Sequence, residues 1–106
     1  MMTTEIVTFG IGNGLQRSDV VAMYDKSVPT WKENQDLRHK SFLYDAEREV
    51  GGGIYLWHSI DAAKSAHGPT FQNRIQEVFG SQPEFRYFES PVVINNHGKA
   101  NVEPTS

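Results

Sequence analysis

The sequence contains no cysteine, which excludes disulfides, thiolate nucleophiles and thiolate metal ligands. Its ten Lys and Arg are scattered without a cluster, against thirteen Asp and Glu, a balance that argues against a nucleic-acid-binding surface. No apolar run approaches the roughly 18 residues that span a bilayer, and residues 1–10 lack the basic start and long apolar stretch of a signal peptide. We therefore expect no nucleic-acid partner, no membrane partner and a cytoplasmic location.

The chain is short but has the composition of a folded domain. It has 106 residues, of which 38% are apolar and 11% aromatic, a balance typical of a globular core. Residues 96–106 are polar and aperiodic, which predicts a flexible tail after a single domain at residues 1–95. A chain of this size buries only about 60–70% of its unfolded surface, so a partner subunit would add stability.

Hydrophobic periodicity predicts four strands and three helical segments. We expect Ser18 to cap the first helix, Pro29 to kink or restart it, and Ser59 to cap the second. The three glycines at 51–53 predict a bulge or a close approach by another group. The expected order is strand 5–11, helix 19–33, strand 37–44, strand 51–57, helix 60–67, helix 70–79, strand 84–89 and a short apolar extension at 92–94.

This order, β-α-β-β-α-β, predicts an α+β fold of the ferredoxin-like type, in which a four-stranded antiparallel sheet carries its helices on one face. The strands are apolar on both faces, with Ile54 and Leu56 on one side and Tyr55 and Trp57 on the other. Helices can cover only one of these faces. We therefore expect a second copy of the chain to cover the other face in a two-fold homodimer.

Several short runs of the sequence together resemble one known family. These runs are Leu37-x-x-Lys40-x-Phe42-x-x-Asp45, Gly52-Gly53-Ile54-Tyr55-Leu56-Trp57, Ala62-Ala63, Phe79-Gly80 and Pro91-Val92-Val93. They are similar to the small mono-oxygenases of the YdhR type, which belong to the dimeric α+β barrel superfamily. The resemblance extends over residues 5–95, and the glycine-rich strand at 52–57 is its most specific part.

The resemblance implies a homodimer whose two sheets form a barrel, with a cavity in each subunit between sheet and helices. Relatives in this superfamily include cofactor-independent oxygenases of phenols, polyketide cyclases, aldoxime- or nitrile-processing enzymes and haem-degrading enzymes. The fold alone therefore selects no reaction. His58 stands where the family would have Glu or another polar residue, and this departure also offers a base.

Histidine is the natural acid or base near neutral pH. His58 is the preferred catalytic base because it follows a strand, where ligand sites of sheet proteins gather. His39 and His67 are further candidates for substrate contact. The structural interpretations are that His39 is a paired strand residue and that His67 stabilises the end of its helix. The spacing of these histidines matches no compact ligand motif, so we expect no metal and no cofactor.

Aromatic side chains fill most small cores, but buried Tyr and Trp need partners for their polar atoms. The alternatives for the aromatic candidates are packing and the lining of a pocket for a flat aromatic substrate. These candidates are Trp31, Trp57 and Phe71 for substrate binding, with Tyr44 and Tyr55 as catalytic hydrogen-bond donors. Lys40 is expected either to anchor an anionic substrate group or to protect an edge strand from aggregation.

The preferred function is that of a cofactor-independent oxygenase. A base would deprotonate a phenolic or otherwise activated aromatic molecule, and the anion would react directly with O₂ in a dry pocket. A polyketide-type cyclase or lyase could use the same base and pocket without O₂. A third hypothesis is a protein that binds a small aromatic molecule without turnover.

Overall fold

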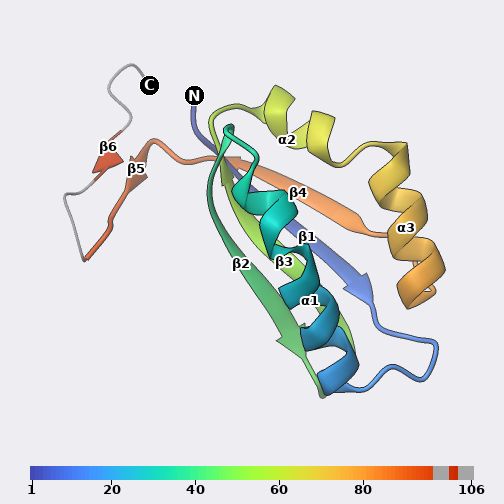
Figure 1. Cartoon of the computed structure of the whole chain (residues 1–106). Helices are drawn as coiled ribbons and strands as arrows, with labels where there is room; N and C mark the ends of the chain where they lie inside the picture. Colours follow the sequence, from blue (N-terminus) through green and yellow to red (C-terminus); the bar gives the residue numbers. More distant parts are fainter. Residues whose placement is uncertain (97–100, 103–106) are drawn as a thin grey trace.

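Four antiparallel strands form one sheet in the order β2-β3-β1-β4, with the helices packed on one of its faces (Figure 1). The computed structural model describes residues 1–96 and 101–102. The main elements are β1 (Thr3–Gly10), α1 (Arg17–Lys32), β2 (Leu37–Asp45), β3 (Val50–Trp57), α2 (Ile60–Ala66), α3 (Pro69–Phe79) and β4 (Glu84–Glu89). This is the predicted ferredoxin-like architecture, and the predicted strand at 84–89 has the observed bounds.

Two short strands, β5 (Val92–Val93) and β6 (Asn101–Val102), pair with each other outside this sheet. Residues 97–100 and 103–106 of the predicted tail lie outside the described residues, so the tail stays a prediction. In the part of the chain that the structure describes, no helix has the length and apolar character of a membrane span.

The helix boundaries follow their capping interactions. The prediction that Ser18 caps α1 is wrong: Gln16 is the N-cap, because the Asp19 carboxylate accepts a hydrogen bond from the Gln16 backbone N–H at 2.8 Å. The helix continues through Pro29 as a single element. A hydrogen bond from the Glu33 N–H to the Pro29 carbonyl closes its last turn. Ser59 caps α2 as predicted, by accepting a hydrogen bond from a backbone N–H of the first turn.

The consecutive glycines of β3 admit the side chain of Tyr24 from α1. The Tyr24 hydroxyl accepts a hydrogen bond from Gly52 N–H at 3.0 Å and donates one to the Leu43 carbonyl at 2.8 Å. A Cβ at Gly51 would lie 2.5 Å from that hydroxyl. The glycines therefore serve a close approach, whereas the irregularity of the sheet lies in β2, between Leu37 and His39.

The two faces of the sheet have different surroundings. The helix side carries the core, which joins strand residues to the helices and includes Val7, Tyr55, Trp57, Val20 and Phe79. The opposite face carries apolar side chains that no layer of the described residues covers, and we call it the open sheet face. It comprises Ile6, Leu43, Ile54, Leu56 and Phe88, of which Ile54 is 37% and Phe88 47% exposed.

Candidate functional site

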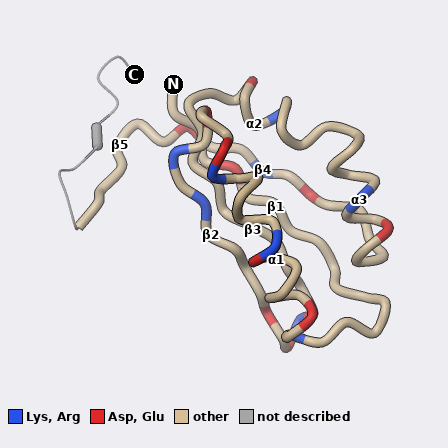
Figure 2. The backbone as a smooth tube through the Cα atoms, in the orientation of Figure 1, with Lys and Arg blue, Asp and Glu red and all other residues tan. Residues whose placement is uncertain are grey.

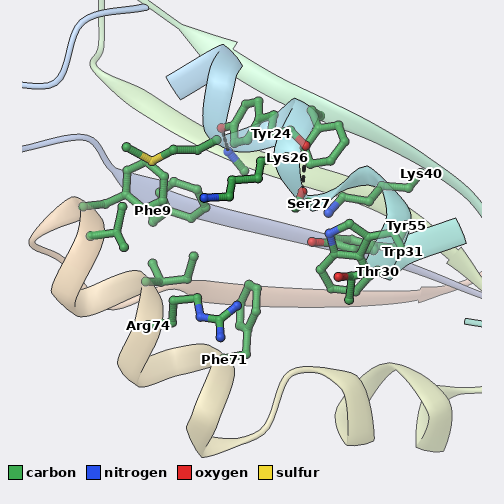
Figure 3. Close-up of a pocket in the computed structure, with 16 residues that line it drawn as sticks. Phe9, Tyr24, Lys26, Ser27, Thr30, Trp31, Lys40, Tyr55, Phe71 and Arg74 are labelled. Atoms are coloured by element: carbon green, nitrogen blue, oxygen red, sulfur yellow. Dashed lines mark hydrogen bonds between the residues drawn. The ribbon is translucent and has the colours of Figure 1, made fainter. Parts of the chain in front are cut away.

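A cavity of about 500 Å³ lies between the sheet, α1 and α3. Strand alternation on β2 and β3 directs Lys40, Phe42 and Tyr55 to the helix side of the sheet. Tyr24 and Trp31 enter from α1, and Phe71 and Arg74 enter from α3 (Figure 3). The walls are therefore mainly aromatic, which suits a flat ligand that stacks on rings.

The amine of Lys40 is surrounded by aromatic rings. Its Nζ lies 3.8 Å from the ring centroid of Trp31, 4.1 Å from that of Phe42 and 4.4 Å from that of Tyr55. Figure 3 shows this amine beside Trp31 and Tyr55 at one end of the cavity. Among the described residues no carboxylate lies within ion-pair distance of Lys40. Lys40 is thus a half-buried amine without a counter-ion.

Two opposing effects act on the proton of Lys40. Burial lowers its pKa from the ordinary 10.5 to about 7, and the more distant Glu5 charge offsets only part of this shift. The negative ring faces of Trp31, Phe42 and Tyr55 favour the ammonium form. Near pH 7 both forms of Lys40 are therefore accessible, as a proton-transfer residue requires.

Basic side chains gather around this cavity and around a second one of about 360 Å³ that shares Trp31, Lys40 and Phe42 with it. The basic lining residues are Lys26, Lys40 and Arg74 in the first cavity and Lys32, Arg38 and Lys40 in the second. No Asp or Glu of the described residues lines either cavity, although the chain has more acidic than basic residues. Figure 2 shows basic positions on α1, β2 and α3, the elements around the cavities. Their field favours an anionic ligand.

The two tyrosine hydroxyls of the cavity remain protonated. Burial is the main cause that raises the pKa of Tyr55 and of Tyr24. Tyr24 already donates its proton to the Leu43 carbonyl. A neutral Tyr55 hydroxyl can donate to a substrate oxygen but is a poor base.

Behind the aromatic wall lies a buried polar cluster of Glu5, Trp57 and His67. His67 Nδ1 lies 2.7 Å from Glu5 Oε1, and both side chains are fully inaccessible to solvent. Trp57 Nε1–H donates a hydrogen bond to the same Glu5 oxygen at 2.9 Å. The His67 ring packs against Phe71 and Tyr55, with centroids 4.3 and 4.7 Å apart. The cluster thus supports Tyr55 and Phe71 of the cavity wall from the side that faces away from the cavity.

The structure brings together four of the predicted site residues at the main cavity: Trp31, Lys40, Tyr55 and Phe71. Trp57 and His67 lie behind its wall, in the buried cluster. His67 is also the C-cap of α2, where its backbone N–H bonds to the Ala63 carbonyl. Its side chain lies against Glu5 in the core, and its expected stabilisation of the helix end stays a prediction.

The other three predicted residues lie away from the main cavity. His58 is exposed after β3, where its backbone N–H bonds to the Asp36 carbonyl at 2.9 Å. Tyr44 packs at the edge of the core without lining the main cavity. His39 is exposed, pairs in register with Leu56 and borders the second cavity. A base at His58 would not meet a ligand in the main cavity, and none of the described residues that line this cavity is a histidine.

Sequence reasoning missed Tyr24, Arg74 and Glu5. The signal for Glu5 was present, because a single acid among alternating apolar strand residues at a buried position needs a buried partner. Tyr24 could have been linked to the glycines of β3, since a large side chain must fill the space that they leave. Arg74 carried no local signal, because its place depends on how α3 packs. Within the described residues no group of three or more His, Asp or Glu side chains could hold a metal ion.

Comparison with known proteins gives structural relatives. No protein-family model matches the chain, and no curated protein matches its sequence. Among solved structures, a protein from Bordetella bronchiseptica assigned as an antibiotic biosynthesis monooxygenase has a TM-score of 0.61 and 17% identity, covering 84% of this chain and 96% of that one. A variant of SnoaB, a cofactor-independent oxygenase from Streptomyces nogalater, has a TM-score of 0.61 and 14% identity, covering 84% and 92%. Rv0793 from Mycobacterium tuberculosis has a TM-score of 0.61 and 14% identity, covering 85% and 95%.

At these identities the similarity establishes the fold. The chain has the ferredoxin-like α+β fold that these solved structures have. Activity is a separate question, because one fold carries many reactions.

Proposed function

We propose that this protein is a cofactor-independent oxygenase of phenolic aromatic molecules, which bind in the cavity between the sheet, α1 and α3. The observation that carries the proposal is the amine of Lys40, which three aromatic rings surround and which has no carboxylate of the described residues within ion-pair distance. The fold shared with SnoaB, described as a cofactor-independent oxygenase, supports it. Within this fold the motif at 52–57 favours a relative of the YdhR type.

In the first step of the proposed reaction, the neutral amine of Lys40 removes the phenolic proton of the substrate. The product is an ammonium–phenolate pair, in which the anion is stabilised by Lys40 and by the basic lining of the cavity. The rings around Nζ stabilise the new ammonium group. The Tyr55 hydroxyl donates a hydrogen bond to the substrate oxygen. Lys40 thus takes the role of base that sequence reasoning assigned to His58.

The oxygen chemistry then balances without a further reactant. An anthrone-type substrate reacts as its enol, which carries the phenolic proton, so the phenolate of the first step and the anion of the activated carbon are resonance forms of one anion. This anion transfers one electron to O₂, and the two radicals combine to a peroxide at that carbon. Lys40 returns the proton, giving R₂CH–OOH. Loss of the remaining C–H proton cleaves the O–O bond, so that R₂CH₂ and O₂ become R₂C=O and H₂O. Exclusion of water by the aromatic walls protects the anion.

The pH dependence tests the role of Lys40. In the free enzyme, the amine must be unprotonated to act as a base, and its pKa is about 7. For a phenol that itself ionises well above pH 9, kcat/KM should rise about tenfold per pH unit below pH 7 and level off above it. A profile that is flat from pH 5 to 9, or that falls with pH, would contradict this assignment.

We further propose a homodimer formed through the open sheet face. Ile6 and Ile54 pair in register at the middle of this face, and a two-fold partner would bring the same apolar surface against it.

Ile54→Asp should convert the protein from a dimer to the 12.0 kDa monomer, because the charge would be buried at the interface. Light scattering after size exclusion measures this, with Thr70→Asp on the exposed side of α3 as the matched control. A wild-type monomer at micromolar concentration would refute the dimer.

A further inference from the structure

In addition to its proposed role as a base, Lys40 offers an amine to which a ligand can bind covalently. We propose that its amine captures aromatic aldehydes and ketones as reversible imines inside the cavity. The site is the enclosed Nζ with Trp31, Phe42 and Tyr55 around it, and the ligand class is a flat aromatic molecule that carries a carbonyl group. This inference concerns carbonyl capture and does not require that the protein oxygenate phenols.

The environment of Lys40 differs from that of the other lysines in the described part of the chain. Lys26 also lines the main cavity but is exposed, as are Lys32 and Lys64. Only the unprotonated amine attacks a carbonyl carbon, and an exposed lysine is almost fully protonated at neutral pH. Burial lowers the pKa of Lys40 to about 7, so a large share of this amine is reactive when exposed lysines are not.

The size and the aromatic walls of the cavity also suit the aromatic imine that Lys40 would form. A volume of about 500 Å³ admits a bicyclic or tricyclic aromatic molecule. Such a ring system would stack among Trp31, Tyr55 and Phe71 while its carbonyl meets Nζ, which raises the effective concentration of the two groups.

The proposed step is balanced. Lys40 Nζ adds to the carbonyl carbon, giving a carbinolamine. The nitrogen lone pair then forms the C=N bond as the C–O bond breaks. The two hydrogens of the amine leave with the oxygen as water, so R–NH₂ and O=CHAr become R–N=CHAr and H₂O. No oxidant, reductant or metal is needed, and water reverses the reaction.

Reductive trapping tests the proposal. The purified protein is incubated at pH 7 under nitrogen with 2-naphthaldehyde and sodium cyanoborohydride, which reduces an imine to a stable secondary amine. Intact mass should show one adduct per chain, and peptide mapping should place it on Lys40. The Lys40→Arg variant keeps the positive charge but should lose this adduct at least tenfold. The Lys64→Arg variant changes an exposed lysine of α2 that lines neither cavity, and it should label like the wild type.

Three results would overturn the proposal: no adduct in the wild type, equal labelling of Lys40 and Lys26, or undiminished labelling of the Lys40→Arg variant. The quantity measured is the intact mass of protein that was incubated under nitrogen, so the result does not depend on O₂ consumption. A protein that forms the adduct but oxygenates no phenol would refute the proposed oxygenase alone. A protein that oxygenates phenols without forming the adduct would refute the imine alone.

Discussion

Replacing Lys40 with methionine is expected to lower the rate of phenol-dependent O₂ consumption by about 10²–10⁴-fold, the usual contribution of a general base. Methionine has a similar length and fills the ring cage, so Trp31, Phe42 and Tyr55 keep a packing partner. What is lost is the group that accepts the phenolic proton and then holds the phenolate. Oxygen-electrode rates with anthrone or dihydroxynaphthalene as substrate, at saturating concentration and pH 8, measure the effect.

The matched control is Lys26→Met, which removes a basic residue that is exposed and lines the same cavity. It should weaken binding of an anionic substrate modestly and leave kcat within a few-fold of the wild-type value, because Lys26 is not surrounded by aromatic rings. If Lys40→Met and Lys26→Met lower kcat equally, Lys40 acts only as part of the positive field. If Lys40→Met keeps the full rate, Lys40 is not the base.

The stability of the Lys40→Met variant separates a lost function from a lost fold. Between about pH 7 and the ordinary pKa of 10.5, the unfolded chain holds the Lys40 proton while the folded chain releases it. The unfolded state binds more protons there, so this group makes the folded protein more stable as pH rises and less stable as pH falls. Lys40→Met removes the cost of burying the amine and should unfold at a urea concentration equal to or above that of the wild type at pH 7.

Removing Glu5 should have the largest effect on stability. Glu5→Ala leaves His67 and the indole N–H of Trp57 without their buried partner. Leaving a buried polar group without its partner costs about 1–3 kcal/mol per group, a large part of the 5–15 kcal/mol that holds a typical domain together. Urea unfolding followed by tryptophan fluorescence measures the free energy of unfolding. Glu84→Ala, at an exposed position of β4, should change it by less than about 0.5 kcal/mol.

A second variant keeps this prediction testable if Glu5→Ala does not fold. The double variant Glu5→Leu/His67→Leu replaces both side chains of the Glu5–His67 contact with apolar ones. It should be more stable than Glu5→Ala, because fewer buried polar groups are left without a partner. A Glu5→Ala protein within about 1 kcal/mol of the wild type would show that the cluster is not the stabilising element described above.

The sequence predicts the fold well because its signals are local. The spacing of apolar residues and the turn and cap residues, such as Ser59 and Gly80, place each element within a few residues. Ser18 was assigned as the cap of α1 on residue preference alone. The deciding interaction was the carboxylate of Asp19 with the backbone of Gln16, which a propensity for capping does not reveal.

The site is less predictable because it depends on contacts between distant parts of the chain. Trp31, Tyr55 and Lys40 were identified from residue type and from the family resemblance, and they do meet at the cavity. The sequence could not show that no described carboxylate lies within ion-pair distance of Lys40, because that depends on which acids surround it after folding. It also could not separate His58 at the surface from His67 in the core, since both follow apolar segments and only tertiary packing buries one of them.

The most direct test of the proposed oxygenase uses ¹⁸O₂. Protein treated with a chelator and freed of metal is mixed with anthrone under ¹⁸O₂, and product and solvent are analysed by mass spectrometry. The mechanism predicts one O₂ consumed per anthrone, with one ¹⁸O atom in the quinone product and the other in water, and little turnover by Lys40→Met. Metal-free protein that consumes no O₂ above the uncatalysed rate, or a Lys40→Met variant as active as the wild type, would contradict it.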